Sequence, residues 1–196
     1  MAAEKETYRE LTERKAGSEQ IFDGVILHVY RDTVTLPNGS PSVRELIRHP
    51  GAVAVVPLTA DGKVIMERQF RYPLDSVIKE IPAGKLDSPT EDRLEAAKRE
   101  LREETGYTAE EWISLGDYHP AAAYSDERLT IFLARRLTKG AQHLDEDEFL
   151  HVEEAPLESL MEGVLAGRIT DGKTQTALMK AWFYLKGQHM QSKTMP

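Results

Sequence analysis

The sequence contains no cysteine among its 196 residues, which excludes disulfide bonds, thiolate zinc sites and a cysteine nucleophile. It also lacks an apolar run of the roughly 20 residues that a membrane-spanning helix requires. The first six residues hold no apolar stretch of the secretory type. We therefore expect a cytoplasmic protein that neither spans nor binds a membrane.

The chain has fewer basic side chains than acidic ones, 25 against 33, and its formal net charge is −8. This balance argues against a broad electrostatic contact with nucleic acid or an anionic membrane. A small anionic substrate remains compatible with it, because a local cluster or a metal ion can reverse the field inside one cleft. With 40% hydrophobic residues, the chain can build a core of one domain with an appendage.

The order of strand and helix patterns predicts the fold class. Strands are expected over 20–36, where Val25 and Leu27 take part in an alternation, and over 42–48 after the Pro37-Asn38-Gly39 turn. The apolar run 52–58 is typical of a strand covered on both faces, and the Asp61-Gly62 turn predicts 63–70 as its hairpin partner. Further strands are expected over 76–81, 129–134 and 149–152, and helices over 88–105, 156–166 and 174–185. This order predicts an α/β fold, with a mixed sheet sandwiched between helices and an N-terminal antiparallel β region before it.

The helix expected over 88–105 has strong end signals. Ser88 can cap it, Pro89 suits its first turn, and Glu91 follows Ser88 by three residues as in a capping box. Gly106 is the expected stop.

Acidic side chains crowd one flank of the last two turns of this helix. At about 100° per residue, Glu100, Glu103 and Glu104 lie beside an apolar stripe. Glu100 and Glu104 form a like-charge i,i+4 pair near the helix C-terminus, where the helix dipole also disfavours anions. A solvated acidic face is one reading of the run. A bound divalent cation would offset the repulsion, and hard carboxylate oxygens suit Mg²⁺, or Mn²⁺ as a substitute, rather than zinc.

A longer motif surrounds these carboxylates. Residues 84–107 spell GKLDSPTEDRLEAAKRELREETGY, which closely resembles the Nudix box, G-x5-E-x7-R-E-U-x-E-E-x-G-U with U apolar. Two positions depart from it: six residues separate Gly84 from Glu91, and Tyr107 stands where an aliphatic residue is usual. The extra residue precedes the helix, so it affects the path of the loop and leaves the spacing of the carboxylates intact.

The resemblance implies an α/β/α sandwich that hydrolyses a nucleoside diphosphate linked to another group. It implies that Glu100 and Glu104 are the principal metal ligands, with Glu103 and the Ala83 carbonyl completing the set. It also implies that Arg99 orients the catalytic glutamates through a salt bridge. From the residues alone, the alternative is a surface i,i+4 pair of Arg99 with Glu95 or Glu103.

Beyond the box, the chain resembles the ADP-ribose and nucleoside diphosphate sugar pyrophosphatase branch of that family. By position, Arg71 would contact the diphosphate and Arg44 would help form the nucleotide pocket. Glu127 matches the residue expected to hydrogen-bond the terminal ribose. In the loop before it, Ala121-Ala122-Ala123 replaces the usual Ser-Pro-Gly, which leaves a hexose nucleotide such as GDP-mannose open as the substrate.

The acidic segment 145–148 is the last candidate. Taken alone it is a solvated loop, whereas the family branch implies that a loop here supplies the catalytic glutamate. Glu146 and Glu148 both fit this role, and the sequence does not separate them.

These observations predict an Mg²⁺-dependent hydrolase of a nucleoside diphosphate sugar, first of all ADP-ribose. The alternatives are a GDP-mannose-like or broad nucleotide-sugar pyrophosphatase, a non-catalytic sensor, and an enzyme acting on oxidised nucleoside triphosphates or capped RNA. We expect a β region over 1–48 and a catalytic Nudix domain over 49–196. The resemblance further implies a homodimer in which the N-terminal strands complete the partner's substrate pocket.

Overall fold

A computed structural model describes residues 7–144, 146 and 148–193, without the side chains of 188–193. Its contacts divide the chain into two compact units. One consists of Met1–His49 with Ala121–Glu127, and the other of Pro50–Pro120 with Arg128–Pro196. No helix in the described ranges is long and apolar enough to cross a membrane.

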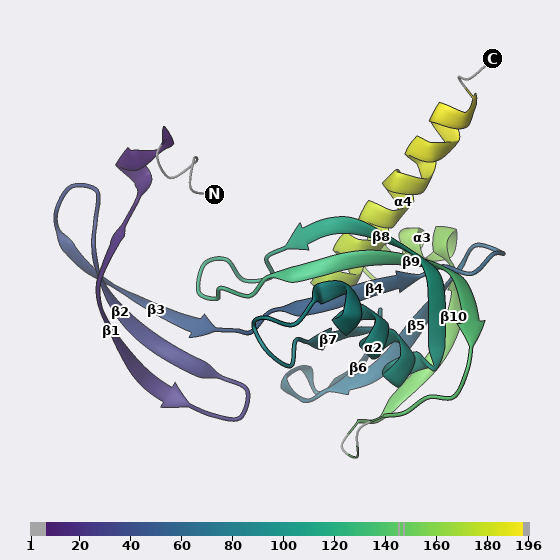
Figure 1. Ribbon diagram of the computed structural model, residues 1–196, viewed down its shortest axis with the longest axis horizontal. Coiled ribbons are helices and arrows are strands. Elements are labelled where there is room, and N and C mark those ends of the chain that lie inside the picture. The colour runs from purple at the N-terminus through teal and green to yellow at the C-terminus, as the bar shows by residue number, and fades with distance from the viewer. Residues whose placement is uncertain (1–6, 145, 147, 194–196) are drawn as a thin grey trace. The chain divides into compact units, whose positions relative to one another are not determined.

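The first unit is a three-stranded antiparallel sheet in the order β1-β2-β3 (Figure 1). A short 3-10 turn, η1 (Arg9–Leu11), precedes β1 (Arg14–Asp23), β2 (His28–Thr35) and β3 (Pro41–Arg48). The prediction of one strand over 20–36 is wrong. Gly24 N–H donates to the Leu27 carbonyl (2.9 Å) and closes a turn there, so Val25 and Leu27 lie exposed in a hairpin loop.

The segment 121–127 joins this unit through the end of β3. Ile47 N–H donates to the Tyr124 carbonyl (2.8 Å), and Asp126 N–H donates to the Ile47 carbonyl (3.2 Å). The loop that carries Ala122 and Glu127 is therefore held by the N-terminal sheet.

Two sheets form the framework of the second unit. One is four-stranded, in the order β7-β4-β9-β8, and the other three-stranded, in the order β10-β5-β6. Their strands are β4 (Ala52–Pro57), β5 (Lys63–Arg71), β6 (Ser76–Glu80), β7 (Ala83–Lys85), β8 (Tyr107–Tyr118), β9 (Leu129–Lys139) and β10 (Leu150–Pro156), with a 3-10 turn η2 (Tyr72–Leu74) after β5. β4 and β9 are parallel and the other pairs antiparallel. The predicted hairpin of 52–58 with 63–70 is wrong, because only a bridge from Leu58 to Val64 joins them and β5 pairs with β6 and β10 instead.

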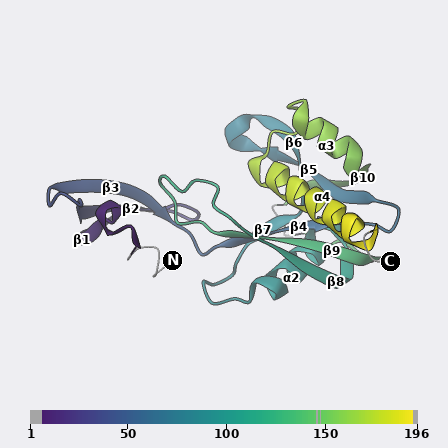
Figure 2. The ribbon, with the colours of Figure 1, turned by 90° about the horizontal axis from the view of Figure 1, so that it is seen from above.

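α2 (Arg93–Thr105) covers one face of the four-stranded sheet and α4 (Gly172–Lys193) covers the other, while α3 (Leu157–Leu165) packs against α4 and β10 (Figure 2). β4 explains this sandwich at the level of residues. Ala54 and Val56 pack into the core that includes α4, while Val53 and Val55 pack into the core that includes α2. The predicted α/β fold, with a mixed sheet between helices and an antiparallel N-terminal sheet, is confirmed.

The helix of the acidic motif begins later than its sequence signals indicate. Asp92 caps α2, because its Oδ1 accepts from the N–H groups of Leu94 (2.9 Å) and Glu95 (3.1 Å). The predicted Ser88 cap is therefore wrong, and Glu91 instead accepts from the Asp87 N–H (2.6 Å). The predicted stop is confirmed, since Gly106 adopts the left-handed conformation at φ 76°.

Candidate active site

The loop after β6 places backbone groups against the acidic flank of α2. The Ala83 N–H donates to Glu104 Oε2 (3.0 Å). A Cβ at Gly84 would lie 2.1 Å from the Glu100 carboxylate, so only glycine lets that carboxylate approach the backbone of β7. Ala83, Gly84, Glu100 and Glu104 thus form one contact surface between β7 and α2.

Glu100 and Glu104 are buried, with 9% and 6% of their surfaces exposed. Burial raises the pKa of Glu100 to about 7, even though Arg99 opposes the shift. Burial also raises the pKa of Glu104 well above its usual value, and the nearby Glu67 and Glu100 carboxylates add to the shift. Because burial disfavours the ionised form of both carboxylates, a bound cation would stabilise that form.

Glu67 is a third buried carboxylate, and sequence reasoning did not select it as a site residue. It lies in β5 and is 3% exposed, and its Oε1 has no hydrogen-bond partner among the described residues. Burial raises the pKa of Glu67 to about 8. A buried carboxylate oxygen without a hydrogen-bond donor is costly, and a bound cation would satisfy it.

Arg99 contacts several groups, and not only one glutamate on the helix surface. Its Nη1 donates to Glu100 Oε1 (2.9 Å) and Glu103 Oε2 (3.3 Å), and its Nη2 lies 3.5 Å from Glu91 Oε1. Nη2 also donates to the Lys85 carbonyl (3.3 Å). The guanidinium therefore joins two of the predicted metal-binding glutamates to the loop before the helix.

The structure distinguishes the two candidate glutamates before β10. Glu148 is half-buried, and its charge contributes to the raised pKa values of Glu67, Glu100 and Glu104. Glu146 is exposed. Glu148 is thus the one within electrostatic range of the buried carboxylates. The neighbouring Asp145 and Asp147 lie outside the described residues.

Arg71 is held by a carboxylate that the sequence analysis did not single out. Its Nε and Nη2 donate to Glu80 Oε1 (2.6 Å) and Oε2 (2.8 Å) in a forked pair. Lys173, at the start of α4, also contacts Glu80 Oε2. Burial and the Arg71 charge lower the pKa of Lys173 to about 7, and Glu67 opposes this shift.

Arg44 and Glu127, both predicted to bind substrate, belong to the unit of the N-terminal sheet. Arg44 is exposed and forms a forked ion pair with Glu13, in which Nε lies 2.9 Å from Oε2. Glu127 is half-buried, and its N–H donates to Ser125 Oγ (3.2 Å). Their substrate roles remain predictions.

The donor set around Ala83 fits a divalent cation, because it consists of hard carboxylate oxygens beside the half-buried Ala83-Gly84 segment. Within the described ranges, however, no three acidic or imidazole side chains are arranged to hold an ion as they stand. Glu100 and Glu103 are engaged by Arg99, and Glu104 by the Ala83 N–H. Each of these contacts uses one carboxylate oxygen, so joint ligation by Glu100, Glu103 and Glu104 would use the other oxygen of each, after a change of side-chain rotamer.

The raised pKa values predict a pH-dependent stability that a divalent cation should reverse. Between the ordinary glutamate value of 4.5 and the values of about 7 and 8 for Glu100 and Glu67, the folded state holds protons that the unfolded chain has lost. These two carboxylates should therefore make stability fall as pH rises through this window, and the lowered pKa of Lys173 offsets part of the fall above pH 7. In a chelator, we expect a melting temperature roughly 5 °C lower at pH 8.5 than at pH 6.0, since about 2–4 °C corresponds to 1 kcal/mol in a domain of this size.

Saturating Mg²⁺ should abolish this decline, because the cation binds the ionised carboxylates. Differential scanning fluorimetry with and without Mg²⁺ measures both effects. The Glu67→Gln variant in the same chelator series should show a shallower decline. Equal stability at both pH values without metal would contradict the prediction.

Comparison with known proteins agrees with this geometry. Residues 48–177 match the model of the NUDIX domain, and residues 13–47 match that of the nucleoside diphosphate sugar hydrolase N-terminal domain. The chain belongs to the Nudix family and is a hydrolase.

Two relatives and one solved structure cover most of the chain. It is 43% identical to an ADP-ribose pyrophosphatase of Bacillus subtilis over 87% of this chain and 92% of that protein. It is 42% identical to a methanol dehydrogenase activator of Bacillus methanolicus over 85% of this chain and 90% of that protein. A crystal structure of an ADP compounds hydrolase superposes with a TM-score of 0.79 at 26% identity, covering 90% of this chain and 96% of that one.

Proposed function

We propose that this Nudix hydrolase cleaves the diphosphate of a nucleoside diphosphate sugar in the presence of Mg²⁺, with ADP-ribose giving AMP and ribose 5-phosphate. One observation carries the proposal: the buried Glu100 and Glu104 carboxylates contact the Ala83-Gly84 backbone, and the buried Glu67 and the half-buried Glu148 lie within electrostatic range of Glu104. The kinship to an ADP-ribose pyrophosphatase supports the choice of substrate.

Each of the proposed site residues has a separate role in hydrolysis. Mg²⁺, when bound by the Glu100, Glu103 and Glu104 carboxylates and the Ala83 carbonyl, supplies charge neutralisation on the diphosphate and activation of water. Arg99 holds two of these carboxylates in place through Nη1. Arg71 binds the diphosphate through its guanidinium, and Glu148 accepts a proton from the attacking water.

A hexose nucleotide is the second candidate substrate, and the loop composition favours it. Ala121-Ala122-Ala123 stands where Ser-Pro-Gly is usual for ADP-ribose hydrolysis. Small side chains in this loop would leave room for glucose or mannose in place of ribose. The family resemblance implies that Glu127 hydrogen-bonds the terminal ribose of ADP-ribose.

The experiment is product formation by the purified protein with Mg²⁺ and ADP-ribose, ADP-glucose, GDP-mannose, UDP-glucose or 8-oxo-dGTP. We expect ADP-ribose to be hydrolysed at least about tenfold faster than the others, a difference of ~1.4 kcal/mol in barrier. Preference for a hexose nucleotide would favour the second candidate. Turnover of 8-oxo-dGTP alone would exclude both, and binding without any turnover would indicate a sensor.

The proposal includes cytoplasmic location and a homodimer formed through the N-terminal strands. The composition of that sheet supports the dimer. Phe22, Ile26 and Val43 expose 56%, 62% and 51% of their surfaces, although they lie in or next to a three-stranded sheet. A second copy of the sheet would cover apolar surface of this kind.

A further inference from the structure

The forked pair of Arg71 and Glu80 orients a guanidinium and also places a negative charge beside it. Glu80 is 2% exposed and engages the Nε and Nη2 edge of Arg71. The third nitrogen, Nη1, lies off this edge. A buried carboxylate with one partner would hold the arginine firmly, yet it would also repel a diphosphate that approaches the same guanidinium.

Lys173 reaches this carboxylate from a position 93 residues further along the chain. Its Nζ contacts Glu80 Oε2 and lies 3.1 Å from Asp171 Oδ2, and its side chain is 16% exposed. The residue approaches Glu80 from α4, whereas Arg71 approaches from β5. Glu80 is therefore shared between two cations.

The first turn of α4 is anchored so that Lys173 is held in this place. Asp171 Oδ2 accepts from the Thr174 N–H (2.9 Å), which fixes the helix start. Thr174 is fully buried, and its Oγ1 accepts from the Ile81 N–H (3.0 Å), directly after Glu80. The lysine and the strand that carries its partner are thus tied together by the backbone as well as by charge.

We propose that Lys173 is a positioning residue for substrate binding. In its protonated form Lys173 neutralises Glu80, so that this carboxylate orients Arg71 without competing with the diphosphate of the substrate. The inference rests on the proposed function, since it takes Arg71 as the diphosphate ligand. The proposal predicts that replacing Lys173 weakens substrate binding while Glu80 is charged. The same replacement should have little effect on binding once the Glu80 charge is removed.

Lys173→Met should raise KM for the nucleotide sugar that the wild type hydrolyses best by about tenfold, because Glu80 loses a charge-assisted contact. The fall in kcat should be less than about threefold, since Lys173 does not touch the reacting atoms. In a Glu80→Gln background, K173M should change KM by less than about twofold, because no buried charge is left to neutralise. Steady-state kinetics of the four proteins completes this double-mutant cycle.

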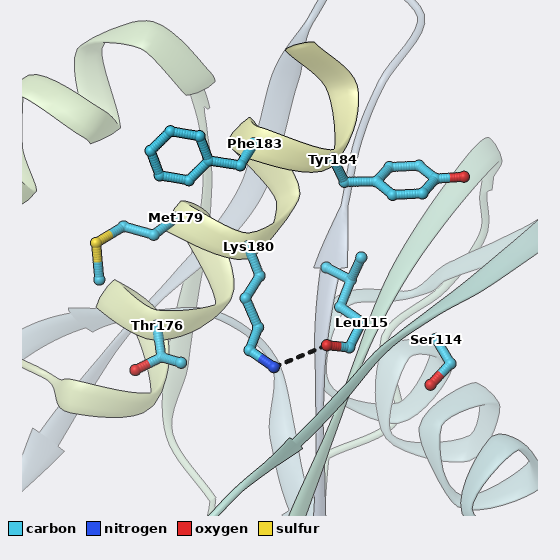
Figure 3. A pocket seen from close by; sticks show the side chains of 7 residues that line it. All are labelled: Ser114, Leu115, Thr176, Met179, Lys180, Phe183 and Tyr184. Atoms are coloured by element: carbon cyan, nitrogen blue, oxygen red, sulfur yellow. Dashed lines mark hydrogen bonds between the residues drawn. The ribbon is translucent and has the colours of Figure 1, made fainter. Parts of the chain in front are cut away.

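Lys180→Met is the matched control, because Lys180 lies on the same helix and also uses its Nζ for a structural contact. Its Nζ donates to the Leu115 carbonyl (2.8 Å) at the edge of a cavity of about 500 Å³ between α4 and β8 (Figure 3). K180M should leave KM within about twofold of wild type, and Lys173→Arg, which keeps the charge, should restore most of the affinity.

An equal rise in KM for K173M in both backgrounds would overturn the proposal, as would a KM unchanged by K173M. If K173M does not fold, as judged by its melting temperature, Lys173→Gln takes its place in the cycle and the same criteria apply. If the wild type hydrolyses no nucleotide sugar, the proposed function fails separately. The cycle is then measured on the dissociation constant for inorganic diphosphate, with the same coupling required.

Discussion

Glu104→Gln is expected to lower kcat by at least about 1,000-fold, or ~4 kcal/mol of barrier. Glu104 is 6% exposed, and one of its oxygens already accepts from the Ala83 N–H (3.0 Å). A glutamine can keep that hydrogen bond, but its amide NH₂ replaces the second oxygen and cannot ligate a cation. The loss should therefore appear in turnover, measured together with an Mg²⁺ titration.

The fold of this variant should persist, because the substitution removes one charge from a cluster in which burial and like charges disfavour ionisation. We expect a melting temperature at or above that of the wild type in a chelator. Glu95→Gln is the matched control on α2, since Glu95 is exposed and pairs with Lys98 on the helix surface. A loss of less than about tenfold (~1.4 kcal/mol) with normal metal dependence would contradict the ligand role of Glu104.

The parts of the fold that could be predicted are those specified by local sequence. The uninterrupted apolar run at β4 requires burial on both faces, and α2 and α4 provide it. Gly106 ends α2 because a left-handed residue is needed there. The start of α2 was mispredicted because two cap signals compete. Asp92 is the residue that caps the helix, and Glu91 contacts Asp87 and Arg99 instead of closing a capping box.

Pairing between distant segments was harder to predict. β8 was missed altogether, because glutamates at 110 and 111 and a bulge near Gly116 interrupt its apolar alternation. β5 follows β4 after a tight turn, and this turn is the reason why the two strands were expected to pair as a hairpin. Its actual partners, β6 and β10, are set by the packing of a second sheet.

The candidate site likewise contains residues that local sequence predicts and residues that it does not predict. Glu100, Glu103, Glu104 and Arg99 share one helix, so their mutual proximity follows from helical spacing. Glu67 is followed in the same strand by the exposed Arg68, and nothing local marks Glu67 as buried. Lys173 meets Glu80 across 93 residues of chain, which no spacing rule anticipates.

Glu148→Gln is expected to lower kcat by about 100-fold to 10,000-fold, the range for loss of a general base. Glu148 is half-buried and its charge helps to raise the pKa of Glu67, Glu100 and Glu104, so it lies within electrostatic range of these carboxylates. Glutamine keeps its shape and cannot accept a proton. Because substrate contacts are unchanged, KM and the Mg²⁺ concentration for half-maximal rate should stay within about threefold of wild type.

Glu146→Gln supplies the control in the same segment. Glu146 is exposed, and its substitution should leave kcat within about twofold, as is usual for a surface side chain away from the chemistry. The two variants also separate base from ligand. If Glu148 acted as a metal ligand, its loss would raise the Mg²⁺ requirement and excess Mg²⁺ would recover activity, whereas loss of a base leaves a low rate at every Mg²⁺ concentration. A larger loss in E146Q than in E148Q would assign the base to Glu146 and show that proximity to the buried carboxylates does not identify it.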